Sequence, residues 1–234
     1  MRGCQNPPAV FDIALGIAYS LALLWMLCGT LYRVLIWICA TSRFSIPLSP
    51  APRSLIGVAG RLSLELLVFR SLARACRTIW LASLLFHYAL LWVLIVHLRF
   101  VFESLPLSLI LFIQFSGWAS AAMVLGLTIL LVRRLLVDRI RYVSALSDHL
   151  HLILLLSIAV SGVALKRLWP TSLYEVGEFL RGAMTLSWVS LPDNAGLVLH
   201  LLLVLILLLV YPISKLVHGF GIVFAPTFNQ IDRS

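Results

Sequence analysis

Residues 195–217 read AGLVLHLLLVLILLLVYPISKLV, a run in which nearly every side chain is apolar. A helix rises about 1.5 Å per residue, so about 20 such residues cross the roughly 30 Å hydrocarbon core of a bilayer. The run contains His200 and is followed at once by His218. Ionisable or metal-binding side chains are costly inside a membrane span and are therefore candidates for function. The stretch predicts a membrane helix that carries functional histidines.

The whole chain has the composition of a membrane protein. Of its 234 residues, 62% are hydrophobic and only 12% are charged, and the mean hydropathy is +1.05. Soluble domains are only about half apolar, so an ordinary soluble globule is excluded. In hydrocarbon every backbone N–H and C=O must be satisfied internally, and the apolar runs lack the alternation of barrel strands. We therefore expect an all-α, polytopic membrane protein.

Five segments are long enough to span the bilayer and should form one membrane-embedded domain over residues 1–234. They lie at about 11–38, 79–101, 107–132, 149–166 and 195–217, the fourth being the shortest. In residues 57–77 leucines alternate with arginines, which is typical of an amphipathic interfacial helix. The connection at 166–194 is long enough for a short surface helix.

The positive residues give an orientation. Ten arginines lie in the first and third connections: Arg43, Arg53, Arg61, Arg70, Arg74, Arg77, Arg133, Arg134, Arg139 and Arg141. The opposite side carries fewer cations, namely Arg2, Arg99, Lys166, Arg167 and Arg181. Acidic residues partly offset them: Asp12, Glu103, Glu175, Glu178 and Asp193. By the positive-inside rule the N-terminus is outside and the C-terminus is cytoplasmic, in the cell's inner membrane. The same rule accounts for the net charge of +9, so we expect no nucleic-acid binding.

Four cysteines are scattered along the chain without a C-x-x-C pair: Cys4, Cys28, Cys39 and Cys76. Neither an iron-sulfur nor a zinc site is indicated. They are expected to be isolated buried thiols.

Four of the six histidines lie in two predicted spans, His87 and His97 in the second and His200 and His218 at the fifth. Because these helices run antiparallel, His87 should share a depth with His218, and His97 with His200. Imidazole is a common axial ligand of haem iron. Eighteen residues are five helical turns, so His200 and His218 should project from one face, as two stacked haems require. Their separation of about 27 Å exceeds the roughly 15 Å between His87 and His97, a difference that tilt and a bend at Pro212 must absorb.

A second interpretation of the same histidines is that they pack across the bundle through hydrogen bonds, without a metal. His149 and His151 are two residues apart and face nearly opposite sides of a helix, so they cannot bind one iron together. They are expected to be interfacial, with a proton-handling role as the minority alternative. Asp148 beside them is expected to cap the fourth span.

Several motifs resemble a known family. The spacings His-x9-His and His-x17-His match the pattern of the nitrate reductase gamma subunit family. A closer similarity is to the M subunit (DsrM) of the sulfite-reduction-associated electron transport complex. It is carried by Gly60-Arg61-Leu62, the segment 65–72, Phe86-His87, the segment 97–100, Arg141-Tyr142, Ser161-Gly162-Val163 and the segment 212–218.

The resemblance implies a five-helix dihaem cytochrome b that exchanges electrons with menaquinone and a cytoplasmic iron-sulfur subunit related to heterodisulfide reductase. Carried over by position, His87 and His218 would hold the cytoplasmic-side haem, and His97 and His200 the outer one. Other membrane or extracytoplasmic redox subunits are expected beside it. The implied role is electron transfer in a quinone-linked oxidoreductase of dissimilatory sulfur metabolism.

Two other classes of function remain open from the residues. One is a non-redox membrane anchor or scaffold of a multiprotein complex, in which the histidines serve packing. The other is a small transporter, although inverted repeats and polar broken helices, which are typical of transporters, are not evident in the sequence.

Overall fold

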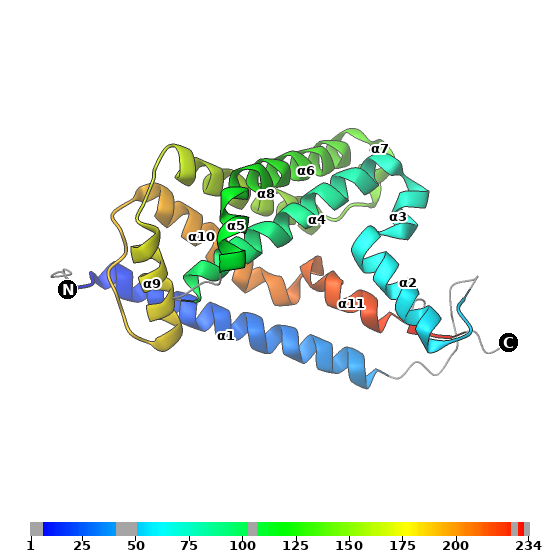
Figure 1. Cartoon of the computed structure of the whole chain (residues 1–234), viewed down its shortest axis with the longest axis horizontal. Helices are drawn as coiled ribbons and strands as arrows, with labels where there is room; N and C mark the ends of the chain where they lie inside the picture. The colour runs from blue at the N-terminus through cyan, green and yellow to red at the C-terminus, as the bar shows by residue number, and fades with distance from the viewer. Residues whose placement is uncertain (1–6, 41–50, 103–106, 226–228, 232–234) are drawn as a thin grey trace. The chain divides into compact units, whose positions relative to one another are not determined.

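A computed structural model describes residues 7–40, 51–102, 107–225 and 229–231 (Figure 1). The described residues do not include Arg2, Cys4, Arg43 and Glu103. The charges used for the orientation are therefore only partly covered. In the described part every regular element is helical. The long helices are α1 (Val10–Cys39), α4 (Arg77–His97), α6 (Ser116–Leu136), α8 (Leu146–Arg167) and α10 (Ala195–Val210).

Five helices of the described residues are long and apolar enough to cross a membrane: Val10–Cys39, Arg77–Phe100, Ser116–Leu136, Leu146–Arg167 and Ala195–Ile213. The predicted all-α, multi-pass membrane fold is therefore confirmed. The direction in which the chain crosses the bilayer stays a prediction.

The third predicted span began too early. Residues 107–132 contain a separate short helix, α5 (Leu107–Gln114), and Phe115 interrupts it before α6 begins. The Trp92 ring of α4 holds α5 in place, since its indole N–H donates to the Phe112 carbonyl at 2.9 Å. The fourth span is 22 residues long, so its prediction as the shortest was wrong.

Asp148 explains where the fourth span begins. Its carboxylate accepts a hydrogen bond from the Ala145 N–H at 3.2 Å, which satisfies one of the unpaired donors at the start of a helix. Arg134 at the end of α6 pairs with the same carboxylate at 3.3 Å. The predicted capping role of Asp148 is confirmed.

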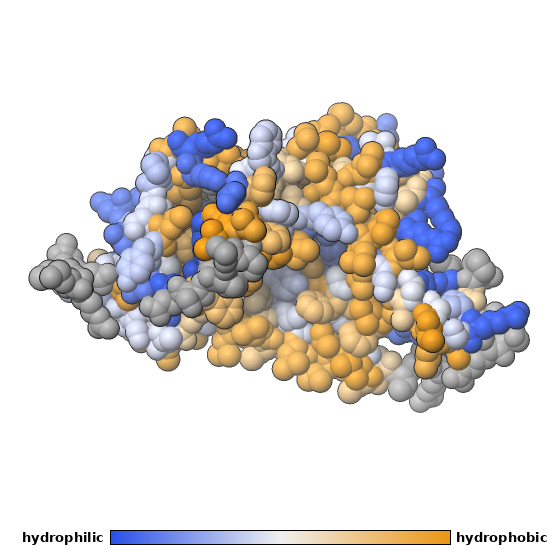
Figure 2. Space-filling view, viewed as in Figure 1, coloured by the Kyte–Doolittle hydropathy of each residue, from blue (hydrophilic) through white to orange (hydrophobic). Residues whose placement is uncertain are grey.

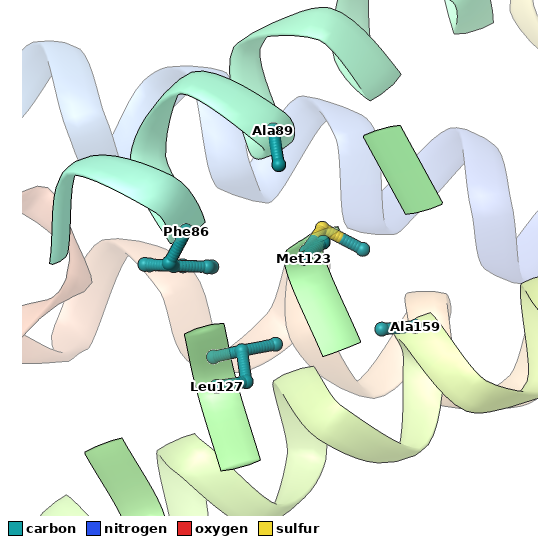
Figure 3. Close-up of a cluster of buried hydrophobic side chains, with 5 residues drawn as sticks. All are labelled: Phe86, Ala89, Met123, Leu127 and Ala159. Carbon is teal, nitrogen blue, oxygen red and sulfur yellow. The ribbon is translucent and has the colours of Figure 1, made fainter. Parts of the chain in front are cut away.

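The chain divides into two compact units, each described separately below. The first combines Met1–Leu23 with Ala82–Leu207. Its centre is a cluster of buried side chains from α4, α6 and α8, which point toward one another in Figure 3: Phe86, Ala89, Met123, Leu127 and Ala159. Helices α6 and α8 run side by side (Figure 1). Gly126 permits a close approach of α4 and α6, because a Cβ there would lie 3.0 Å from the Phe86 backbone nitrogen.

The predicted surface helix in the connection 166–194 is α9 (Leu173–Thr185). Its inner side is buried, and Phe179 meets Tyr19 of α1 edge-on at 6.5 Å. Ser20 of α1 donates to the Ala183 carbonyl at 2.6 Å. Helix α9 thus packs on α1 within the first unit through its apolar side.

Large apolar side chains also cover much of the chain's outer surface. Leu21, Leu24, Leu91 and Leu94 are each more than half exposed, and Figure 2 shows apolar residues over much of the visible face. Water penalises such exposure, whereas lipid tails do not. The outward leucines are consistent with a lipid-facing surface.

The second unit combines Leu24–Leu81 with Leu208–Ser234. The predicted helix over 57–77 is in fact two helices, α2 (Leu55–Val68) and α3 (Arg70–Ala75). Phe69 between them has the left-handed φ of 49°, a conformation that cannot continue a right-handed helix. The buried Glu65 bridges the break, accepting hydrogen bonds from the Ser71 N–H and from the Ser71 hydroxyl at 2.7 Å.

The fifth span does not continue as a helix to His218. After α10 come two 3₁₀ turns, Tyr211–Ile213 and Lys215–Val217, and then the short helix α11 (His218–Phe224). Ser214 between the turns is extended, with ψ of 176°. Pro212 lacks an N–H and therefore cannot complete the helical ladder. The expectation that His200 and His218 project from one face of a straight helix was wrong, because five regular turns do not separate them.

Cys28, Cys39 and Cys76 are unpaired thiols, as the sequence indicated. Cys28 and Cys39 are exposed on the chain rather than buried. Both lie on α1, whose outward surface is largely apolar.

Candidate cofactor site

His200 is the predicted ligand with the most defined surroundings. It lies on α10 and is half-buried, and its Nδ1 is 2.8 Å from the Ser161 hydroxyl oxygen of α8. Gly162, the next residue of α8, lies under the ring: a Cβ there would sit 3.3 Å from the His200 Cε1. Ser161 and Gly162 together form a cradle that fixes the plane of the imidazole.

His97 is the last residue of α4, and its Nδ1 is 2.7 Å from the Val93 carbonyl oxygen. His97 and His200 both belong to the first compact unit. The pairing of these two histidines at one depth stays a prediction.

Arg99 lies two residues beyond His97, in the 3₁₀ turn η1 (Leu98–Phe100). Its guanidinium lies 4.8 Å from the centre of the Phe100 ring. In the described part of the chain, the buried Nε of Arg99 has no hydrogen-bond partner. A buried donor without an acceptor is costly, so this cation is suited to an anionic group at the His97 end of α4.

His87 lies on α4 between Phe86 and Ala89, two members of the core cluster of the first unit. Its Nδ1 is 2.7 Å from the Ser83 carbonyl oxygen, and its ring meets Phe86 edge-on at 4.7 Å. His218 begins α11 in the second unit, with Nδ1 3.0 Å from the Lys215 carbonyl oxygen. Their pairing with each other stays a prediction.

The hydrogen bonds of these rings determine which nitrogen carries the proton. A carbonyl oxygen only accepts, so Nδ1 of His87, His97 and His218 must donate. A neutral imidazole with Nδ1 protonated has its lone pair on Nε2, the atom that a metal ligand uses when Nδ1–H binds a carbonyl. His149 has a similar bond to the Ala145 carbonyl at 3.2 Å, so the tautomer alone does not identify a ligand.

A stripe along α1 fixes the segment that carries His218. The stripe consists of Trp25, Gly29, Arg33 and Trp37, spaced four residues apart and therefore on one face. Trp25 donates to the Leu209 carbonyl at 2.9 Å, and the Arg33 guanidinium donates to the Ile213 and Ser214 carbonyls, both at 3.0 Å. These donors satisfy carbonyls on both sides of Pro212, where the regular helix breaks.

The other two members of the stripe make close contacts. A Cβ on Gly29 would be 2.7 Å from the Pro212 Cβ, so only glycine fits there without a shift. Trp37 stacks obliquely on Phe224 of α11 at 6.2 Å. The α1 stripe therefore holds both sides of the break before His218.

The residues present fit a bis-histidine porphyrin. Among the described residues no group of three or more His, Cys, Asp or Glu side chains has metal-binding geometry. A porphyrin supplies four nitrogens itself, so an iron within it needs only two axial imidazoles. The oriented His200 ring and the His97 ring at the end of α4 offer two imidazoles, and the Nε–H of Arg99 is suited to a carboxylate.

Sequence reasoning missed Ser161 as a partner of His200 and missed the α1 stripe altogether. Nothing in the sequence indicated that Ser161 bonds a histidine, apart from its place in the Ser161-Gly162-Val163 motif. Arg33 did carry one, since a cation in a membrane span is a functional candidate by default. The four-residue spacing of Trp25, Gly29 and Arg33 was also visible in the sequence.

Comparison with known proteins assigns the class of this chain. The sequence model of the nitrate reductase gamma subunit matches residues 70–230, and the chain belongs to that family. It is 32% identical to the Hdr-like menaquinol oxidoreductase cytochrome b-like subunit of Archaeoglobus fulgidus, covering 86% of this chain and 74% of the relative. The subunit of the same name from Archaeoglobus profundus is 28% identical over the same shares of the two chains. The similarity to the M subunit of the sulfite-reduction complex stays a resemblance.

Proposed function

We propose that this chain is the dihaem b membrane subunit of a quinone-linked oxidoreductase complex. It moves electrons between menaquinol and a cytoplasmic iron-sulfur subunit. The observation that carries the proposal is the oriented His200 imidazole, whose Nδ1 is bonded to Ser161 beside Gly162. The names of the relatives, which describe cytochrome b-like subunits of menaquinol oxidoreductases, support it.

In this proposal His97 and His200 provide the axial imidazoles of one haem, and His87 and His218 those of the other. When bound, each haem supplies an iron that accepts and gives up one electron at a time. The protein holds the rings through their Nδ1–H groups, which leaves Nε2 as the coordinating atom. Arg99 supplies the positive charge for a propionate beside His97.

Menaquinol is proposed to bind on the side of the His97 and His200 pair and to release its protons there. With the N-terminus outside, that side is the outer face of the membrane. The electrons then leave on the cytoplasmic side, where the arginine-rich connections face an acidic surface of a heterodisulfide reductase-like iron-sulfur subunit. Other membrane or extracytoplasmic redox subunits complete the complex, whose role is dissimilatory sulfur metabolism.

A pyridine haemochrome assay on the purified chain tests the proposal. About two haem b per chain are expected, one for each pair of axial ligands. A monodisperse preparation without haem would contradict it and favour the non-redox anchor, in which the Ser161–His200 bond serves only packing. Purification of the native complex with an iron-sulfur subunit would test the partner, and the identity of that subunit would test the sulfur role.

A further inference from the structure

We propose that Ser161 sets the reduction potential of the haem held by His200. This inference rests on the proposed function and adds a positioning residue to it. Ser161 lies on α8, which carries none of the four proposed ligands. It would act on the iron only through the His200 imidazole, with which it shares a hydrogen bond of 2.8 Å.

The direction of this hydrogen bond follows from counting protons. The Ser161 hydroxyl is also 3.0 Å from the carbonyl oxygen of Ile158, one turn earlier in α8. A carbonyl can only accept, and a hydroxyl has a single hydrogen. Both contacts are hydrogen bonds only when the hydroxyl donates to Ile158 and accepts from the Nδ1–H of His200.

This arrangement polarises the ring in one direction. An acceptor on Nδ1–H draws the proton partly away and makes Nε2 a stronger electron donor. A more strongly donating axial ligand favours the oxidised iron. Because the Ser161 oxygen is itself polarised by its bond to Ile158, the two bonds strengthen each other. Loss of the hydroxyl should therefore raise the potential of the haem held by His200.

Gly162 makes the effect specific to this position. A Cβ at Gly162 would approach the His200 Cε1 to 3.3 Å, tighter than most side-chain contacts. The ring consequently lies close to α8, where the Ile158 carbonyl, the other acceptor beside it, is bonded to the Ser161 hydroxyl. The Ser161 hydroxyl and the glycine that follows it act as one orienting unit.

The test compares Ser161→Ala with Ser120→Ala in the full chain reconstituted with haem. Ser120 is a matched control on another membrane helix, α6, where its hydroxyl also donates to a carbonyl one turn earlier, that of Ser116, at 2.8 Å. In the described part of the chain its hydroxyl makes no hydrogen bond to a histidine. Potentiometric titration of the haem absorption and the low-spin electron paramagnetic resonance signals provide the readouts. We expect Ser161→Ala to raise the potential of one haem and to shift its resonance, while the other haem and the Ser120→Ala protein stay as in the wild type.

Two further variants keep the inference falsifiable if the alanine variant does not accumulate. Ser161→Thr retains the hydroxyl and should keep the wild-type potential, whereas Ser161→Cys offers a weaker acceptor and should raise it. Unchanged potentials in both Ser161→Ala and Ser161→Cys would overturn the inference while leaving two haems and the proposed function intact. Absence of haem from the wild-type protein would instead overturn the proposed function, and this inference with it.

Discussion

His200 and His218 are held by two different kinds of interaction. His200 is bonded directly to a neighbouring helix through Ser161. His218 bonds to the Lys215 carbonyl of its own segment, and that segment is in turn fixed by Trp25 and Arg33 of α1. The first histidine is oriented by contact with its ring, and the second by capping of the backbone that precedes it.

The difference separates two ways in which a substitution can disturb a ligand. A change near His200 should alter the electronic properties of the ring while leaving the fold intact. A change in the α1 stripe should move the backbone before His218 and weaken binding itself. The reduction potential should therefore respond to changes near His200, whereas haem content and stability should respond to changes in the α1 stripe.

The largest effect is expected from removing the ligands. His97→Ala and His200→Ala should each abolish the same haem signal, because both imidazoles serve one iron. His149→Ala is the control, since its ring has a similar bond to a carbonyl but lies outside the ligand set. Haem stoichiometry and the optical spectra of the single variants provide the measurement. Loss of different haems in the two variants would contradict the pairing of His97 with His200.

Arg33→Leu should have the next largest effect, confined to the haem of His218. The change removes both donors to the Ile213 and Ser214 carbonyls, at a cost of about 2 kcal/mol for each charged hydrogen bond. We expect a lower melting temperature and partial loss of one haem, with the His97 and His200 signature retained. Arg74→Leu is the control, because Arg74 is an exposed cation of the same unit. Equal loss of both haems would show that α1 supports the whole bundle rather than this segment.

A pair of glycine variants sharpens the comparison. Gly29→Ala would place a methyl group 2.7 Å from the rigid Pro212 ring and should cost about 1–3 kcal/mol through overpacking. Gly162→Ala meets only the edge of the His200 ring at 3.3 Å and should change the resonance of that haem more than it changes stability. The melting temperature and the resonance spectrum measure the two effects.

Gly219→Ala is the control for both glycine variants. Nothing lies within 4 Å of a Cβ at that position, and alanine favours helix over glycine. It should be neutral or slightly stabilising although it neighbours His218. A large loss of stability in Gly219→Ala would mean that the region around His218 is more tightly packed than the α1 stripe alone implies.

The sequence was sufficient for the apolar helices and insufficient for their interruptions. Each span was recognisable because about 20 apolar residues have few alternatives in a bilayer. The breaks at Phe69, Phe115 and Ser214 depend on contacts made elsewhere, such as the Glu65 carboxylate and the Arg33 guanidinium. Pro212 did indicate a bend, but not the extended Ser214 that follows it.

The same distinction applies to the candidate site. The prediction that His97 pairs with His200 uses helix direction and depth alone, because regular helix connects each residue to the end of its span. The orientation of His200 could not be predicted, since it depends on Ser161, which another helix supplies. The relation of His200 to His218 failed because residue counting assumes an unbroken helix.

The smallest effects are expected from two carboxylates that cap helices in the two units. Asp148 accepts from the Ala145 N–H and pairs with Arg134 in the first unit, while Glu65 accepts from Ser71 in the second. Replacing a cap by a residue that cannot accept costs about 0.5–2 kcal/mol, so Asp148→Ala and Glu65→Ala should each lower the melting temperature modestly. The amide variants Asp148→Asn and Glu65→Gln keep one acceptor and should lose less.

Neither cap touches a proposed ligand, so both haem potentials should stay at their wild-type values in all four variants. A shift in potential from Glu65→Ala would extend the region that governs His218 from the α1 stripe to the break at Phe69. A shift from Asp148→Ala would instead connect the start of α8 to Ser161, which lies on the same helix. Either result would show that a residue without direct contact to a ligand also controls a haem potential, contrary to the comparison of the two histidines.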